Sequence, residues 1–338
     1  MKQTASSLRR LALVVRAVVI TATLAGFATA PTTAAASSPA PMLNPGLPAE
    51  QLESATTSAI LGSQHAGNRI VSVGEHGIIL LSDDSGKTFR QAALVPTRAT
   101  LTSLYFANEM TGWAVGHWGV ILRTDDGGEH WTVQRSDINV DRPLFSVYFK
   151  SQTEGWAVGL WSLMLHTVDG GKTWGEVKLP VPAGATKADA NLYAITGSRA
   201  GPLYIAAERG LVVKSTDGGA TWSYSETGFK GSLWAVAVLK DSAIMVGGLR
   251  GGMLRSEDEG KSWASIQTQH KNSITGIEQN PDGSITAVGL DGLQLTSHDD
   301  GVTFSGIQRP DRATITVAVP LSKGGPLLFS AGGPLTAE

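Results

Sequence analysis

One short motif occurs six times in the chain, and this repetition constrains the fold more than any other feature. The motif reads Ser/Thr-x-Asp-x-Gly-x-Thr-Trp/Phe, with His130 and Ser262 as the two departures at its penultimate position. Its aspartates follow one another at intervals of 41 to 48 residues, at Asp84, Asp126, Asp169, Asp217, Asp258 and Asp299. Six copies at a nearly constant spacing predict a radial repeat fold.

The residue types in this motif, which we call the Asp-box, favour a structural hairpin over a catalytic or metal site. A short carboxylate can accept backbone N–H bonds in a tight turn, and glycine tolerates a positive φ there. The aromatic residue that ends each box can pack between neighbouring units. The motif has fewer oxygen ligands than a calcium loop needs. We therefore expect the six aspartates to be structural, and we expect no metal and no cofactor.

A second series of small residues supports the repeat and adds a seventh unit. Pairs such as Val115-Gly116 precede the boxes by about nine or ten residues, and Ala331-Gly332 ends the series without a box. Each unit holds four β-branched segments separated by Gly or Asp, which in the second unit lie at 101–106, 112–116, 119–124 and 130–134. Four strands in about 41 residues are typical of a propeller blade, so we predict an all-β, seven-bladed β-propeller.

Two segments of different composition precede the predicted propeller, which we place at residues 55–338. Residues 1–36 combine a basic start, an apolar run and small residues, which predicts a secretory signal peptide. An uncleaved anchor helix is the alternative, although Arg16 interrupts the apolar run. Residues 37–54 are rich in Pro and Ala and are expected to form a linker. Because the last unit ends before its box, we expect a segment between residues 44 and 58 to supply a closing strand.

Cysteine content and charge limit the cellular compartments and the types of partner that fit this chain. The chain has no cysteine and a formal net charge of −2. It therefore has no disulfide framework and no cysteine for lipid attachment, and we expect a periplasmic or otherwise exported protein. The balanced charge gives no indication of nucleic acid as a partner.

The repeat units resemble the photosystem II stability/assembly factor family, a family of Asp-box (BNR-repeat) propellers. The resemblance rests on Leu101-Thr-Ser-Leu-Tyr-Phe, Gly112-Trp-Ala-Val-Gly and Gly119-Val-Ile-Leu-Arg-Thr-Asp-Asp-Gly-Gly, and the third unit matches equally well. It covers nearly all of residues 55–333, and Gly-Trp-Ala-Val-Gly is its more specific part. The resemblance implies a non-enzymatic seven-bladed propeller that helps to assemble a membrane complex. Some bacterial relatives are encoded beside RND-type exporters, so it also suggests an exporter as a partner.

The loops between units carry a pattern that the scaffold does not require. A basic residue stands just before the first strand of six units, at Arg98, Arg142, Lys187, Lys230, Lys271 and Arg312. First strands line the central channel of a propeller, so we predict a cationic ring around one channel mouth. The alternative is that these side chains serve solubility or form ion pairs within the repeat.

The turns between second and third strands belong to the same face and add further candidates. They contribute Arg209, Arg250, Trp118 and Trp161. Aromatic and arginine side chains on an exposed face favour protein binding. The alternative for Trp118 and Trp161 is that each indole folds over a neighbouring unit and is half buried. The loop at 180–191, which accounts for the longest interval between boxes, lies on this face too.

We therefore predict an exported, non-enzymatic propeller that binds a membrane or envelope protein, or its assembly intermediate, through this basic and aromatic face. One alternative is a glycan-binding or sialidase-like propeller, in which the two exposed tryptophans would stack on sugars. Its carboxylates, Glu75, Glu208 and Asp291, lie on separate units, whereas glycoside hydrolysis needs them to converge. Tyr105 and Tyr148 are repeat-equivalent, which favours a scaffold role. A second alternative is a structural module with no binding face.

Overall fold

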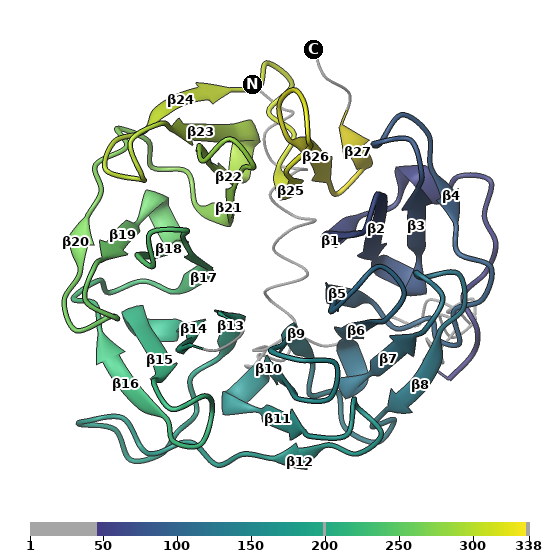
Figure 1. The fold of residues 1–338 in the computed structure, drawn as a ribbon, viewed down its shortest axis with the longest axis horizontal. Helices are drawn as coiled ribbons and strands as arrows, with labels where there is room; N and C mark the ends of the chain where they lie inside the picture. The colour runs from purple at the N-terminus through teal and green to yellow at the C-terminus, as the bar shows by residue number, and fades with distance from the viewer. Residues whose placement is uncertain (1–45, 199–200, 336–338) are drawn as a thin grey trace, which may run out of the picture. The chain divides into compact units, whose positions relative to one another are not determined.

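The structure is a computed structural model that describes residues 46–198 and 201–335. In these ranges the elements are β-strands and single-turn 3-10 helices, and the strands form seven antiparallel sheets (Figure 1). The prediction of an all-β, seven-bladed propeller is confirmed. The expected signal peptide, residues 1–36, lies outside the described residues. No helix within the described ranges is long and apolar enough to span a membrane.

The sheets follow one another in chain order, and the first strand of each lies nearest the centre of the ring (Figure 1). Blades 1 to 3 contain β1 (Ile60–Ala66), β2 (Arg69–Gly74), β3 (Ile79–Ser82) and β4 (Arg90–Gln91); β5 (Leu101–Phe106), β6 (Gly112–Gly116), β7 (Ile121–Thr124) and β8 (Thr132–Arg135); and β9 (Leu144–Phe149), β10 (Gly155–Gly159), β11 (Met164–Thr167) and β12 (Gly175–Glu176).

The remaining blades follow the same plan. Blades 4 to 7 contain β13 (Leu192–Gly197), β14 (Leu203–Ala207), β15 (Leu211–Ser215) and β16 (Ser223–Glu226); β17 (Leu233–Val238), β18 (Ile244–Gly248), β19 (Met253–Ser256) and β20 (Ala264–Ser265); β21 (Ile274–Gln279), β22 (Ile285–Gly289), β23 (Leu293–Ser297) and β24 (Ser305–Gln308); and β25 (Ile315–Val319), β26 (Leu327–Ser330) and β27 (Gly333–Leu335). The 3-10 turns are η1 (Ala55–Thr57), η2 (Glu75–Gly77), η3 (His117–Gly119), η4 (Leu160–Ser162), η5 (Glu208–Gly210), η6 (Leu249–Gly251) and η7 (Leu290–Gly292).

Each Asp-box is a closed network of hydrogen bonds. In the second box, Thr124 Oγ1 donates to Asp126 Oδ1 at 2.8 Å and accepts the Gly128 N–H at 3.0 Å. The first box repeats this network, and hydrogen bonds from the Thr88 side chain and backbone lower the pKa of the Asp84 carboxyl to about 2. The carboxylates are thus engaged within their own turns.

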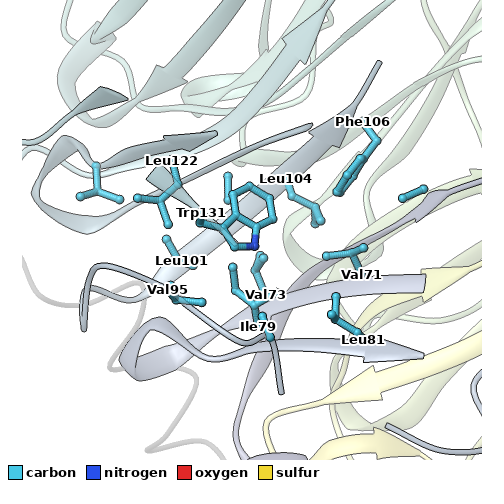
Figure 2. Packing of buried hydrophobic residues seen from close by; sticks show 14 residues of the cluster. Val71, Val73, Ile79, Leu81, Val95, Leu101, Leu104, Phe106, Leu122 and Trp131 are labelled. Atoms are coloured by element: carbon cyan, nitrogen blue, oxygen red, sulfur yellow. The ribbon is translucent and has the colours of Figure 1, made fainter. Parts of the chain in front are cut away.

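The aromatic residue of the second box packs between two blades. Figure 2 shows the Trp131 indole surrounded by apolar side chains, and its exposed fraction is 1%. These neighbours come from blade 1, at Val71, Val73, Ile79 and Leu81, and from blade 2, at Leu101, Leu104 and Leu122. The indole N–H donates to Gly128 O at 2.9 Å, so burial of this large side chain leaves no polar atom unpaired.

A basic side chain on each of the first five blades forms a hydrogen bond to the Asp-box of the next blade. In each case it donates to the backbone carbonyl of the residue after the box aspartate, at 2.8 to 3.2 Å. The pairs are Arg69 with Gly127, Arg123 with Gly170, Lys150 with Gly218, Lys214 with Glu259, and Arg255 with Asp300. These carbonyls would otherwise depend on water, so charged donors join neighbouring blades at their outer turns.

The inner strand of every blade carries a β-bulge at its second residue. A bulge re-aims the side chain of the extra residue. In blade 2 this residue is Thr102, whose Oγ1 donates to Leu144 O of blade 3 at 2.7 Å. Thr275 of blade 6 makes the same bond to Ile315 O of blade 7 at 2.6 Å. The bulge therefore supplies a second link between blades.

The ring closes without the strand that the sequence led us to expect. Described residues 46–58 form no strand, and the last sheet has three strands in the described range. Instead η1 lies against β27, where a Cβ added at Gly333 would come within 1.8 Å of Thr56 O. The segment before η1 binds blade 1, with the Ala49 N–H donating to Val95 O at 2.9 Å. Within the described residues, closure thus rests on contacts between blades 7 and 1 and not on a shared sheet.

Candidate functional site

The turns η2 to η7 and the loops between blades share one face of the propeller. Backbone hydrogen bonds show this directly: the His117 N–H donates to Thr100 O at 2.9 Å, and the Leu249 N–H donates to Ser232 O at 2.9 Å. Each bond joins a turn to the residue just before the inner strand of the same blade. The Asp-boxes connect the third and fourth strands and lie on the opposite face. All ten side chains of the predicted binding face therefore share one side.

The central residue of each of these turns adopts a left-handed conformation. The φ angles lie between 52° and 62°, at His76, Trp118, Trp161, Arg209, Arg250 and Asp291. Only Asn, Asp and Gly enter this region readily, and bulky side chains there are uncommon. Tryptophan and arginine are thus not the residues that the backbone of the turn prefers.

Several of the predicted cations are neutralised by nearby carboxylates. Arg98 Nη1 lies 2.8 Å from Glu50 Oε1, in the segment before the propeller. Lys187 Nζ and Arg209 Nη2 both contact Asp189, at 3.3 and 2.6 Å. The hydrogen bond from Arg209 lowers the pKa of the Asp189 carboxyl, so this acid stays ionised.

Arg142 belongs to the same group. Its Nη2 lies 3.5 Å from Glu176 Oε1 on β12. The four paired cations, Arg98, Arg142, Lys187 and Arg209, all lie in the loops and turns of blades 1 to 4. The predicted ring is therefore not uniform in charge.

The remaining four cations have exposed side chains that form no ion pair with any described residue: Lys230, Arg250, Lys271 and Arg312. They come from the loops and the turn of blades 5 to 7. We call these four side chains the cationic sector. Unpaired cations on neighbouring blades add to a local positive potential.

A cavity lies beside the cationic sector. Its volume is about 660 Å³, and both Arg250 and Lys271 line it together with Phe229 and Trp263. The indole N–H of Trp263 donates to Ser225 Oγ at 2.9 Å, so the ring is held in place. None of the described residues lining this cavity is acidic. The arrangement could accept an apolar group that carries a negative charge.

Exposed apolar side chains stand on this face in the turn and loops next to blades 2 and 3. Trp161 has an exposed fraction of 49%, and Ile138, Val140 and Val181 in the neighbouring loops are also exposed. We call these four side chains the apolar sector. The backbone N–H of Trp161 donates to Asn191 Oδ1 at 2.9 Å, which fixes the turn that presents the indole.

Trp118 is placed differently from Trp161. It is partly buried, and its backbone N–H donates to Asp141 Oδ1 at 2.7 Å. Burial opposes ionisation of Asp141, but hydrogen bonds from the His117 ring and the Trp118 N–H lower the pKa of its carboxyl. Asp141 therefore holds the turn as an anion.

Sequence reasoning missed three aromatic residues at the channel mouth. They occupy the bulge position of the inner strands of blades 3 to 5: Phe145, Tyr193 and Trp234. All three line the central cavity, and the Phe145 and Tyr193 rings are stacked with centroids 5.7 Å apart. The signal was present in the sequence, because aligning the inner strands places these aromatics at the position that is threonine in blades 2, 6 and 7.

The carboxylates of the glycosidase alternative hold the scaffold of separate blades. Glu75 Oε1 accepts the Ala59 N–H at 3.2 Å, and Glu208 accepts the Asn191 N–H at 3.1 Å. Asp291 Oδ2 accepts a bond from the Asn272 side chain at 3.2 Å. Within the described ranges, no three His, Asp or Glu side chains are grouped so that they could hold a metal ion.

Comparison with known proteins gives one family and two informative structures. The model of the family described as photosynthesis system II assembly factor YCF48 matches residues 89–224. A search of curated proteins finds no match. The solved structure of YCF48 bound to a D1 peptide shares 18% identity, with a TM-score of 0.68, over 89% of this chain and 100% of that one.

A second solved structure gives the same architecture. YCF48 from Cyanidioschyzon merolae shares 17% identity, with a TM-score of 0.63, over 82% of this chain and 94% of that one. At this identity the structural likeness establishes the fold alone. The family model, in contrast, matches the sequence of the repeats at residues 89–224. The chain is thus similar to this family over residues 89–224, and it shares the β-propeller fold of the two YCF48 structures.

Proposed function

We propose that this protein is an exported, non-enzymatic propeller that binds a segment of a membrane or envelope protein and acts as an assembly, stability or accessory factor. The observation that carries the proposal is the cationic sector, whose four side chains have no acidic partner among the described residues. The same face presents Trp161 with half of its surface exposed. A similar structure, YCF48, holds a D1 peptide, which supports a protein partner.

The two sectors suggest the chemistry of that segment. The cationic sector lies over blades 5 to 7 and the apolar sector over blades 2 and 3, on either side of the channel mouth. A chain segment with an acidic part and an apolar part complements both. The paired cations between them, such as Arg209 with Asp189, contribute shape more than charge.

Backbone conformation gives further support. Trp161 and Arg250 adopt φ angles of 52° and 55°, where glycine or asparagine would cost less. Bulky residues persist in such conformations mainly at functional positions, because their cost must be offset by another benefit. Binding of a partner is a benefit that explains both side chains at once.

Two narrower expectations have less support. The glycan-acting alternative is weakened because Glu75 and Glu208 are engaged by backbone N–H groups of their own blades. An RND-type exporter as partner rests on the family resemblance alone.

The test is cross-linked capture of a partner from membranes of the organism that makes the protein. The wild type is compared with a variant that changes Lys230, Lys271 and Arg312 to Glu. The matched control changes Lys87, Lys172 and Lys261 to Glu, because these exposed lysines lie in the Asp-boxes on the opposite face. We expect the first variant to lose the protein that wild type and control both recover. Equal recovery by all three chains would refute the proposed face.

A further inference from the structure

The central channel contains a cavity whose chemistry differs from that of the basic face. Its volume is about 590 Å³, and it is lined by the inner strands of all seven blades. Of the described residues that line it, Glu278 is the one acid, and neither Lys nor Arg is among them. Glu278 is therefore the group that gives the cavity a negative charge when its carboxyl is ionised.

Glu278 differs from the other carboxylates singled out above. Those accept hydrogen bonds or form ion pairs, as Asp126 and Glu208 do. The Glu278 side chain is open to the channel and has no hydrogen bond or ion pair with any described residue. Solvent reaches it through the channel, yet protein surrounds it, and this burial raises the pKa of its carboxyl to about 7. A carboxylate in such a place costs free energy unless a cation joins it.

The opposite wall of the channel is aromatic at the same level. Glu278 is the fifth residue of β21, and Tyr105 and Tyr148 are the fifth residues of β5 and β9 in the same register. Figure 1 shows β21 across the ring from β5 and β9. The two tyrosine rings meet edge to face with centroids 5.2 Å apart, and both line the cavity; Tyr105 is partly exposed, whereas Tyr148 has an exposed fraction of 6% and packs in the core against it. Aromatic faces attract organic cations.

We propose that the central channel binds an organic cation, whose ammonium or guanidinium group pairs with Glu278 and which contacts the partly exposed ring of Tyr105 on the opposite wall. The group can come from a basic side chain of a partner segment or from a free amine. Apolar lining residues such as Val236 and Val319 would cover the carbon chain that bears the charge. This site does not depend on the basic face, because it selects the opposite charge.

Other titratable groups in the channel leave Glu278 as the charge that the ligand would meet. His65 Nε2 lies 2.7 Å from Pro320 O and is thus engaged by the backbone. The Tyr193 hydroxyl donates to Glu208 at 3.2 Å, and burial raises the pKa of that phenol. Affinity for a cation should accordingly follow the ionisation of Glu278.

The first test is calorimetric titration of the purified chain with n-butylammonium and n-butylguanidinium, with n-butanol as the neutral probe. We expect both cations to bind and the alcohol to bind at least tenfold more weakly. Glu278→Gln, which keeps the shape of the side chain, should weaken cation binding at least tenfold. Glu226→Gln is the control, because Glu226 is an exposed acid on an outer strand. Equal binding by the wild type and Glu278→Gln, or no binding of either cation, would overturn the proposal.

Two further arms keep the test decisive. In the wild type alone, affinity for n-butylammonium should fall about thirtyfold from pH 8 to pH 5.5, as the ionised fraction of Glu278 does, and a flat profile would contradict the role of Glu278. N-acetyl-lysine methylamide and putrescine represent a partner side chain and a free amine. Tighter binding of N-acetyl-lysine methylamide would indicate a side chain of a partner, and tighter binding of putrescine would indicate a free amine. Tyr105→Leu should weaken binding severalfold at every pH.

Discussion

Thr316 Oγ1 donates a hydrogen bond of 2.6 Å to Ile60 O, and this bond joins blade 7 to blade 1 across 256 positions of the chain. It occupies the bulge position that Thr102 and Thr275 use to link successive blades. The junction between the first and last blades is thus made by the same contact as two interior junctions. A ring closed in this way does not need a shared sheet at the seam.

The first prediction concerns that seam. Thr316→Val keeps the shape of the side chain but leaves Ile60 O without its donor, so the free energy of unfolding should fall by about 1–2 kcal/mol. Thr275→Val removes the equivalent bond between blades 6 and 7 and should cost a similar amount. Chemical denaturation of both variants checks this. No loss for Thr316→Val beside a clear loss for Thr275→Val would show that closure depends on other contacts.

The hydrogen bonds that basic side chains form to the Asp-box of the next blade lead to a second prediction. Arg255 has an exposed fraction of 9%, and it holds Asp300 O at 2.9 Å and Asp241 Oδ2 at 2.7 Å. Arg255→Met should therefore lower the free energy of unfolding by about 2 kcal/mol, because it removes the charge-assisted hydrogen bonds that a buried guanidinium makes to two acceptors. Lys214→Met removes the equivalent, more exposed link to Glu259 O and should cost about 1 kcal/mol or less. Equal losses in thermal or urea unfolding would contradict the importance of burial.

A third prediction separates buried from exposed box aromatics. Trp131→Ala should cost about 3–5 kcal/mol, because it empties the space between blades 1 and 2 seen in Figure 2. Trp222 is only partly buried, so Trp222→Ala should cost clearly less. Urea denaturation of both variants measures the difference. The reverse order would mean that the box aromatics do not act through burial between blades.

Stability should also depend on pH through Glu278. Burial raises the pKa of this carboxyl from 4.5 to about 7, so the folded chain holds the proton more tightly than the unfolded chain. The free energy of unfolding should then fall as pH rises from 4.5 to 7, and the loss should be complete above pH 7. Glu278→Gln should be more stable than the wild type at pH 8, by on the order of 1 kcal/mol because channel water screens the charge. At pH 4.5 the two chains should be equally stable, and a constant difference would be inconsistent with this ionisation.

The architecture could be predicted because the signals for it are local and repeated. The Asp-boxes and the series of Val-Gly pairs predicted seven units, and the seven sheets of the structure follow that repeat in chain order. The first two strands of blade 2 were anticipated as they stand, whereas β7 begins at Ile121, because residues 117–119 form a 3-10 turn, and β8 runs over Thr132–Arg135 instead of 130–134. Alternation within a strand and glycine between strands are properties of neighbouring residues, so the sequence displays them directly.

The details of the site depend on residues far apart in the sequence. The partner of Arg98 is Glu50, which reaches it through the path of the segment before the propeller. No local pattern indicates that path, so the sequence could not separate paired from unpaired cations. The links from Arg69 and Lys214 to the next Asp-box come from different strands of their blades, which hides them from a simple repeat alignment. The aromatic channel mouth was readable, but only once the register of the inner strands was compared.

The most direct test of the central claim is a binding isotherm between the labelled chain and membranes of its own organism, measured by flotation at low and physiological salt. The account predicts that changing Lys230, Lys271 and Arg312 to Glu raises the membrane concentration at half-saturation at least tenfold. The same change at Lys87, Lys172 and Lys261 should leave that concentration within a factor of two. The salt dependence should be lost only in the first variant. Equal weakening by both variants would show general charge attraction, and no weakening by either would contradict the basic face as the binding surface.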